Sequence, residues 1–308
     1  MTPVSVVICT RDRPDDLARC LPTVLASDYP DFEVVVVDQS ASDASERIVA
    51  AIADPRLNYR RQHGAGKGRA LNAALVQTEG DVLAHTDDDC TVPPEWLRRA
   101  TSVLADEPEA GIVFGALDSP PIDWDEMFVP TFQPPSYRRL QGRFAFVRVP
   151  RIGVGANMCV RRNVYERLGG FDEFMGPGSR FRSGDEWDLA YRAMKAGFAV
   201  VQDPSNVVVH WGRRSYADGS ARRILRNKYY GVGAGFVKHL RCGDPLAAYA
   251  LLQLALRDTV YLAGNLVRLR RQTGAARLLY LALGVVRGLR QPIDRRHWLF
   301  VPAGHERA

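Results

Sequence analysis

The chain has 308 residues, of which 46% are hydrophobic, so it is long enough to bury a full core in one large domain or in two unequal parts. Its five cysteines are scattered and include no CxxC pair, which argues against a disulfide framework and a cysteine-based zinc site. The opening residues run directly into a strand pattern without an export signal, so we expect a cytoplasmic protein.

The net charge of +6 is distributed unevenly along the chain. Residues 210–308 hold 18 Arg and Lys against 5 Asp and Glu, a net charge of +13, whereas residues 1–209 carry a net charge of −7. A basic C-terminal region beside a more acidic body suggests that this region faces an anionic partner. The alternative is a solvated basic surface.

The first 117 residues predict alternating strands and helices. Short β-branched runs, such as VSVVIC and FEVVVVD, are typical of strands buried on both faces. In chain order the pattern predicts strand 4–9, helix 13–27, strand 32–38, helix 42–53, strand 57–62, helix 66–78, strand 80–87, helix 93–105 and strand 111–117. Such alternation forms βαβ units, so we predict an α/β fold with a mostly parallel sheet flanked by helices.

Residues 118–150 break this pattern, because they are rich in proline and aromatic residues and show no clear period. We expect a long loop here, and long loops are often functional. Regular structure is expected again in a strand at 154–162, a helix at 163–170, a glycine-rich loop at 176–184, a helix at 185–197 and a strand at 206–211.

Three consecutive carboxylates, Asp87, Asp88 and Asp89, close the expected strand at 80–87. In a parallel α/β sheet, ligands collect at the carboxyl ends of the strands. Closely spaced carboxylates can share a hard cation, and Mg²⁺ or Mn²⁺ usually keeps coordination places for substrate phosphates. The sequence therefore predicts a divalent metal that carries a diphosphate. The alternative is that one of these residues caps the following helix.

Asp38 closes the second expected strand, where a carboxylate could accept hydrogen bonds from a ribose or a base. An aspartate that begins a turn is common, so this signal is weak by itself. Neither GxGxxG nor GxxxxGK[ST] follows the first strand, which argues against the usual dinucleotide and P-loop sites.

Six stretches in order together resemble the family 2 glycosyltransferases of the GT-A fold, over roughly residues 4–211. They are VSVVICTRDRPDDLARCL, VVVVDQSASD, GAGKGRALNAAL, TDDDCTVPPEWL, GANMCVRRNVYERLGGFDE and SGDEWDLAYRAMKAG. The fourth resembles the DxD motif of the family, and the last resembles its GEDvDL block. Each stretch is ordinary alone, but six in the correct order and spacing are specific.

The resemblance implies a nucleotide-sugar donor and a role for several residues in binding it. By this similarity Thr10 and Arg11 line the base pocket, Asp38 holds the nucleoside, and Lys67 lies near the base or the diphosphate.

The resemblance also implies a site for Mg²⁺ or Mn²⁺. Asp87 and Asp89 match the two aspartates of the DxD motif, and Asp88 between them is a further nucleotide or metal contact. His210 matches a histidine that often lies beside the metal and pyrophosphate in the family. By itself, a histidine that ends an apolar strand is usually structural.

Inverting transfer needs one general base, which removes the proton of the acceptor hydroxyl. Alignment on Asp188 and Leu189 places the catalytic aspartate of the family at Glu186. Because GDEWDL exchanges the acidic pair of GEDvDL, the base is either Glu186, which we favour, or Asp185. The alternative is that these acids only favour the dipole at the start of a helix.

The C-terminal region is expected to be helical, with arginines between apolar runs of about a dozen residues, too short for a membrane span. We predict a glycosyltransferase domain at 1–215, divided into a nucleotide-sugar part at 1–116 and an acceptor and catalytic part at 117–215, and a basic helical extension at 216–308. Two readings of the extension stay open: it binds an anionic membrane surface at the inner face of the cell membrane, or it packs on the domain or forms a homodimer. Nucleic-acid binding is not expected.

The leading interpretation is a sugar transferase for a saccharide or lipid-linked acceptor, in synthesis of a cell-surface polysaccharide or glycolipid. The alternatives are a sugar-nucleotide nucleotidyltransferase and a non-catalytic homologue that binds nucleotide sugars. The sequence names neither the donor sugar nor the acceptor.

Overall fold

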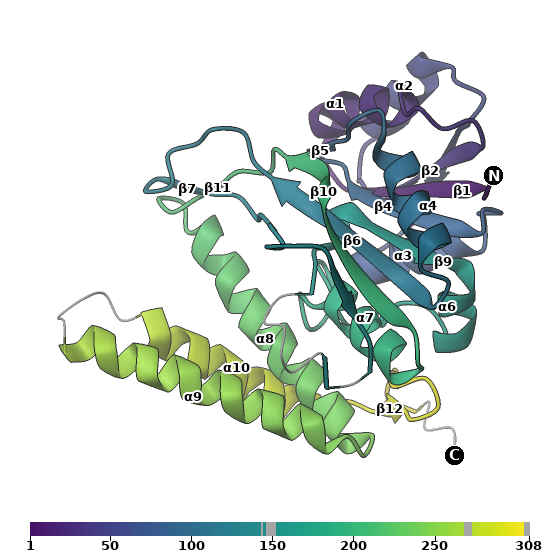
Figure 1. The fold of residues 1–308 in the computed structure, drawn as a ribbon. Helices are drawn as coiled ribbons and strands as arrows, with labels where there is room; N and C mark the ends of the chain where they lie inside the picture. Colours follow the sequence, from purple (N-terminus) through teal and green to yellow (C-terminus); the bar gives the residue numbers. More distant parts are fainter. Residues whose placement is uncertain (143, 146–151, 268–272, 305–308) are drawn as a thin grey trace.

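The computed structural model describes the chain except residues 143, 146–151, 268–272 and 305–308. It confirms an α/β fold with a central, mostly parallel sheet flanked by helices and followed by C-terminal helices (Figure 1). Across the sheet the strands are β3 (Leu57–Arg61), β2 (Phe32–Asp38), β1 (Val4–Thr10), β4 (Val82–Asp87), β9 (Met158–Arg161), β6 (Ala110–Asp118), β10 (Ala199–His210) and β5 (Cys90–Thr91), and β8 (Arg138–Leu140) also pairs with β10.

The register of the sheet aligns the ends of three neighbouring strands. β1 runs parallel to β2 and β4, so that Thr10 lies beside Asp38 and Cys9 lies beside Asp87. β5 runs antiparallel to β10 and places Cys90 beside His210. The polar residues at these strand ends are therefore brought to one edge of the sheet.

Helices such as α1, α3, α4 and α7 cover the sheet with an apolar face, whereas α9 and α10 pack on α8. In α1, for example, Leu17, Leu21 and Val24 are buried, and a proline occupies the first turn, where its missing N–H costs nothing. The helices are α1 (Pro14–Leu25), α2 (Ala44–Ile52), α3 (Lys67–Leu75), α4 (Trp96–Asp106), α6 (Arg162–Leu168), α7 (Asp185–Lys195), α8 (Ser220–Arg241), α9 (Pro245–Val267) and α10 (Thr273–Leu289), with a 3₁₀ turn, η1 (Gly155–Asn157).

Two details differ from the expected elements. The strand expected at 154–162 begins with η1, and β9 is antiparallel to both β4 and β6. The strand expected at 206–211 is only the end of β10, which begins at Ala199 and whose register shifts between Asp203 and Val207. Pro204 lies at this irregularity, where a residue without an N–H is tolerated.

Short ladders complete the described structure. β7 (Met127–Phe128) pairs with β11 (Arg214–Ser215) beside the N-terminal end of α8. β12 (Ile293–Asp294) pairs with β13 (Leu299–Phe300) near the C-terminus. The described part of the loop expected at 118–150 contains the short strands β7 and β8.

A set of fully buried charged side chains joins α8 to α7 and to the loop that precedes α7. Lys238 Nζ lies 2.6 Å from Asp172 Oδ2 and 2.6 Å from Asp188 Oδ1, and all three side chains are fully buried. Arg192 Nε donates to Asp188 Oδ2 at 2.8 Å, and His239 Nε2 lies 2.9 Å from Asp188 Oδ1. The expected domain division at residue 215 stays a prediction, but α8 and α7 share this buried interface.

Candidate active site

A cavity of about 700 Å³ opens at the carboxyl ends of β1 and β4. Nine of the ten site residues predicted from the sequence line it: Thr10, Arg11, Lys67, Asp87, Asp88, Asp89, Asp185, Glu186 and His210. They come from β1, β4, β10, α3 and α7 and from the turns beside these elements. The register of the strands brings the residues of β1, β4 and β10 together.

Asp38 is the one predicted residue that does not line this cavity. Its carboxylate is buried and accepts hydrogen bonds from the Tyr59 hydroxyl and from the Ser40 backbone N–H, each at 2.7 Å. The next residue, Gln39, lines the cavity instead. A contact between Asp38 and a nucleoside stays a prediction.

The three consecutive carboxylates are each held by a hydroxyl or a basic group. Asp87 forms an ion pair with Lys67. Asp88 accepts a hydrogen bond from Thr10 Oγ1 at 2.8 Å, and Arg13 Nη1 lies 3.3 Å from Asp88 Oδ1 and 3.0 Å from Asp89 Oδ2. The chain itself therefore supplies much of the positive charge that three adjacent carboxylates require.

These neighbours separate the pKa values of two adjacent aspartates. Burial raises the pKa of Asp88 to about 6, and Arg13 only partly offsets this effect. Burial also opposes ionisation of Asp89, but His210, Arg13 and Arg214 outweigh it and hold the pKa of Asp89 well below its usual range. Of these two aspartates, Asp89 is therefore the one that keeps its negative charge to lower pH.

The capping alternative finds no support in the described residues. The helix that follows the carboxylates is α4, whose N-cap residue is Glu95. No side chain caps its first turn.

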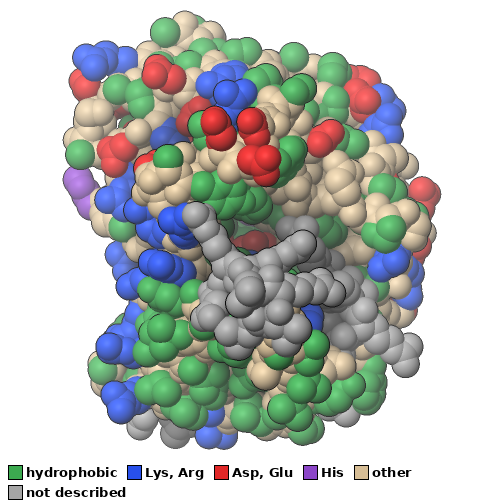
Figure 2. All heavy atoms as spheres, turned by 90° about the vertical axis from the view of Figure 1, so that its left-hand side faces the viewer, with side chains coloured by type: hydrophobic (Ala, Val, Ile, Leu, Met, Phe, Trp, Pro, Cys, Tyr) green, Lys and Arg blue, Asp and Glu red, His purple; other side chains and the backbone are tan. Residues whose placement is uncertain are grey.

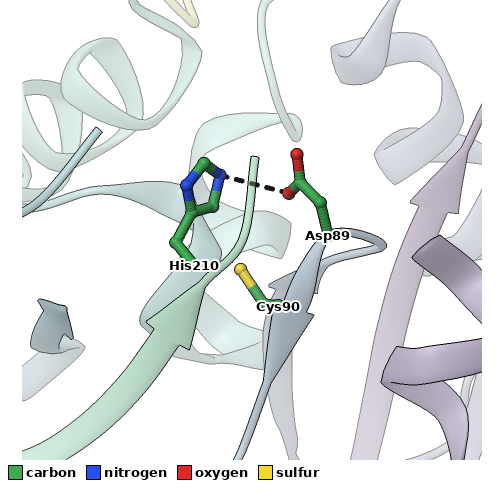
Figure 3. Close-up of side chains that lie close together, drawn as sticks. All are labelled: Asp89, Cys90 and His210. Carbon is green, nitrogen blue, oxygen red and sulfur yellow. Dashed lines mark ion pairs between the residues drawn. The ribbon is translucent and has the colours of Figure 1, made fainter. Parts of the chain in front are cut away.

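Asp89, Cys90 and His210 form a group whose potential ligand atoms lie within 4.8 Å of one another (Figure 3). His210 Nε2 lies 3.1 Å from Asp89 Oδ1, and both side chains are buried. In the described part of the chain, His210 Nδ1 has no hydrogen-bond partner. Burial keeps the pKa of the Cys90 thiol well above its usual value, so this sulfur does not suit a hard cation.

Asp89 and His210 therefore fit a divalent cation, since carboxylate oxygen and imidazole nitrogen are ligands of Mn²⁺. Asp87 lies outside this group, beside Lys67. Its expected part in metal binding stays a prediction.

A second carboxylate pair lies in the same cavity, where α7 begins with Asp185 and Glu186. Burial raises the pKa of Glu186 well above its usual value, and the adjacent Asp185 raises it further. A Cβ placed on Gly155 would lie 3.6 Å from Glu186 Cβ and 3.8 Å from Lys67 Nζ. Glu186 and Lys67, the ion-pair partner of Asp87, therefore approach each other at Gly155.

The loop before α7 passes Asp185 closely. Gly176 has a φ of +91°, and a Cβ there would lie 2.7 Å from Asp185 Cγ. Only glycine suits both the backbone conformation and the space.

Sequence reasoning missed several residues of the cavity. Arg13 and Arg214 both approach Asp89, Arg214 at 3.6 Å, and Arg182 lines the wall near α8. Arg13 lies within the first of the six stretches, Arg182 directly before the last, and Arg214 four residues after His210. Their positions along the chain do not by themselves show that they face the cavity.

The fold and cavity define a GT-A type of α/β protein. A family model described as "Glycosyl transferase family 2" matches residues 5–169, more than half of the chain. The chain therefore belongs to this family.

Curated relatives share the sequence over much of the chain. The succinoglycan biosynthesis protein ExoO of Rhizobium meliloti is 29% identical over 72% of this chain and 63% of its own length. The glucosyl-dolichyl phosphate glucuronosyltransferase of Haloferax volcanii is 28% identical over 62% of this chain and 61% of its own length. The chain thus spans about three fifths of the length of these relatives.

Solved structures support the fold. The mannosyltransferase PcManGT of Pyrobaculum calidifontis, in complex with GDP-Man and Mn²⁺, matches with a TM-score of 0.64 and 21% identity, over 94% of this chain and 87% of that chain. The S. aureus TarS fragment 1–349 with UDP-GlcNAc matches with a TM-score of 0.58 and 16% identity, over 76% and 66%.

Proposed function

We propose that the protein is a metal-dependent, inverting glycosyltransferase that moves a sugar from a nucleotide sugar to an acceptor hydroxyl. The observation that carries this proposal is the placement of Glu186, whose pKa is raised, in the same cavity as the Asp87–Asp89 turn. A base and a diphosphate site in one cavity are what a single displacement requires. The names of two relatives, in succinoglycan synthesis and in glucuronosyl transfer to a dolichyl phosphate sugar, support a role in polysaccharide or glycolipid synthesis.

The donor would lie along the ends of β1 and β4. Thr10 and Arg11 would contact the nucleotide, together with Asp38 if its hydrogen bonds to Tyr59 and Ser40 rearrange. Lys67 would approach the diphosphate, since its ammonium group already lies at the carboxylate turn.

Asp89 and His210 would hold Mg²⁺ or Mn²⁺, and the cation, when bound, supplies positive charge to the leaving nucleotide diphosphate. A solved relative in fold contains Mn²⁺ with its donor, which supports this choice of metal for the proposal.

Glu186 would act as the base. As the acceptor oxygen forms its bond to the anomeric carbon, the bond from that carbon to the diphosphate breaks and the hydroxyl proton passes to Glu186. A carboxylate whose pKa is raised accepts a proton more readily than an ordinary one, which suits this step. Asp185 sustains the raised pKa and is the second candidate.

The family assignment argues against a nucleotidyltransferase, and the complete set of cavity carboxylates argues against a non-catalytic homologue. The saccharide or lipid-linked acceptor, the cytoplasmic location and the homodimer stay predictions.

The test begins with thermal stabilisation of the purified protein by a panel of nucleotide sugars that includes GDP-mannose and UDP-GlcNAc, with and without Mn²⁺. We expect one donor class to stabilise the protein only with metal, by about 2.7 kcal/mol at a concentration of about 100 Kd. That donor is then supplied with candidate acceptors, and the anomeric configuration of the product is measured by NMR. A product with retained configuration, or stabilisation that ignores the metal, contradicts the proposal.

A further inference from the structure

The helical hairpin of α9 and α10 exposes a row of large aliphatic side chains. Both helices pack against α8 on their inner side. On the outer side the following residues are between 42% and 66% exposed: Leu252, Leu256, Val260, Leu279, Leu283, Val286 and Leu289. We call these seven residues the hairpin face. Their spacing of three or four residues along each helix is that of one stripe per helix.

The hairpin face forms part of a broad apolar surface. Figure 2 shows hydrophobic side chains gathered over the lower part of the molecule, where α9 and α10 lie, with basic side chains along one margin. The acidic side chains at the surface in this view lie above it. A contiguous apolar surface of this kind usually marks a binding face.

The exposed charges around the hairpin face are mostly basic. α8 contains no acidic residue, and Arg222, Arg223 and Arg226 on its first turns are exposed. Arg287 and Arg290 at the end of α10 are exposed as well. The exposed Asp218 just before α8 is outnumbered by these arginines and accepts a hydrogen bond from the Ser220 backbone N–H.

The described carboxylates of this region are already held by the chain. Asp244 is buried against Lys195 and Tyr191, and Asp258 is buried beside Arg257 and Arg277. Asp294 is paired with His297. These acids do little to offset the basic margin.

The basic charge around the hairpin face distinguishes between two binding partners, a second copy of the chain and an anionic membrane. A second copy would bring one basic surround against another, and the repulsion would oppose the apolar gain. An anionic bilayer matches both features, because arginines bind its headgroups while leucines and valines enter the acyl boundary. Among the described helices, none is long and apolar enough to cross a membrane, so the contact would lie in the plane of the surface.

We propose that the hairpin face docks on an anionic membrane surface. The docking would also fix the position of the catalytic cavity. Ile224 and Asn227 of α8 line that cavity, while Gly233 further along α8 packs so closely on α10 that a Cβ there would clash with the Leu281 carbonyl. One rigid helix thus joins the hairpin to the active site, and a docked molecule holds its cavity beside the bilayer.

The experiment is sedimentation of the full chain with vesicles, either of phosphatidylcholine alone or of phosphatidylcholine mixed with phosphatidylglycerol. We expect binding to the mixed vesicles at low salt, little binding to phosphatidylcholine alone, and release at high salt. The double variant Leu252→Ser, Leu256→Ser should reduce the bound fraction by about tenfold or more, because both side chains would lose their burial in the acyl boundary. Arg287→Glu with Arg290→Glu should weaken binding to mixed vesicles only.

Val76→Ser is the matched control, since Val76 is 83% exposed after α3 and lies outside the hairpin. It should sediment like the wild type. Thermal unfolding of each variant checks that the fold is kept. Because docking needs no transfer, Glu186→Gln should also sediment like the wild type, so that failure of the proposed reaction and failure of docking are distinguished.

Three results would overturn the proposal. The first is a folded wild type that ignores mixed vesicles at low salt. The second is a Leu252→Ser, Leu256→Ser variant that binds as well as the wild type. The third is a wild-type dimer that this variant converts to monomer without any vesicle binding, which would make the hairpin face a contact between copies.

Discussion

Two clusters of charged side chains both include residues of α7, and they differ in what surrounds them. The buried cluster joins Asp172, Asp188, Arg192, Lys238 and His239, and every member is buried. The cavity cluster contains the carboxylates of the Asp87–Asp89 turn and of the first turn of α7, which line the cavity.

The buried cluster is balanced. It contains two carboxylates, one ammonium group and one guanidinium group, and burial lowers the pKa of His239 to about 4, so that this ring is neutral near pH 7. The two Asp188 oxygens are both occupied, and Arg192 also donates to the Leu168 and Gly170 carbonyls. Among the described residues, His239 Nδ1 is the one polar side-chain atom of this cluster without a hydrogen-bond partner, and it is fully enclosed. The cluster joins α7 to α8.

The cavity cluster is not balanced in the same way. Its residues line an open cavity, where Asp89 pairs with His210 and Glu186 is held in an environment that disfavours its charge. Carboxylates kept in this condition are characteristic of functional sites. The comparison predicts that changes in the buried cluster reduce stability, whereas changes in the cavity cluster reduce activity.

The largest effect is expected from Lys238→Met. Loss of the ammonium group leaves the Asp172 and Asp188 carboxylates buried with too little positive charge. Removing one partner of such a buried cluster costs about 3–5 kcal/mol. Urea unfolding measures the loss. Arg222→Met, on an exposed position of the same helix, is the control and should change stability by less than about 0.5 kcal/mol.

A loss below about 1 kcal/mol for Lys238→Met would mean that the buried cluster does not stabilise the contact between α7 and α8. A Lys238→Met chain with no folded fraction, under conditions where Arg222→Met is folded, counts as the expected result.

The next effect concerns the base. Glu186→Gln keeps the shape and hydrogen bonding of the side chain but cannot take a proton, so turnover should fall by about 10²-fold or more while donor affinity is kept. Asp185→Asn is the matched comparison and should lower turnover much less. Steady-state kinetics with the identified donor and acceptor measures both, and the reverse order would assign the base to Asp185.

A smaller effect is expected at the metal site. His210→Ala removes the imidazole beside Asp89, so the Mn²⁺ concentration needed for donor binding should rise by about tenfold or more. His297→Ala, which removes a histidine paired with Asp294 away from the cavity, is the control. Donor titrations at a series of Mn²⁺ concentrations make the measurement. Unchanged metal dependence in His210→Ala would place the cation elsewhere.

Much of the fold and of the cavity could be predicted from local patterns. The β-branched runs at β1 and β2 can only be buried strands, and their alternation with amphipathic helices implies a parallel sheet whose ends meet. The strand pattern alone predicts Asp87 at a ligand-binding strand end, whereas Thr10 is predicted in the site only by the resemblance to the family.

The rest depends on contacts between distant residues. The insertion of β9 between β4 and β6 follows from tertiary packing, not from the residues of β9. Lys238 and Asp172 are 66 positions apart, and nothing in the basic sequence of α8 shows which of its two lysines pairs with buried carboxylates. Asp38 matches a position of the family. Its hydrogen bond from Tyr59 could not be predicted from the sequence, because it depends on the pairing of β3 with β2.

The last and smallest effect is the pH dependence of stability in Glu186→Gln. Burial and Asp185 raise the pKa of Glu186 in the folded protein, whereas in the unfolded chain it stays near about 4.3. Between these two values the folded protein holds a proton that the unfolded chain has released, so wild-type stability falls as pH rises. Glutamine does not titrate and escapes this loss. Denaturant unfolding from pH 4 to 8 should therefore show Glu186→Gln gaining stability relative to the wild type as pH rises through this interval, with a constant difference above it. A difference that shrinks with pH would mean that Lys67 outweighs burial and lowers the pKa, and Glu186 would then be a poorer base than the cavity suggests.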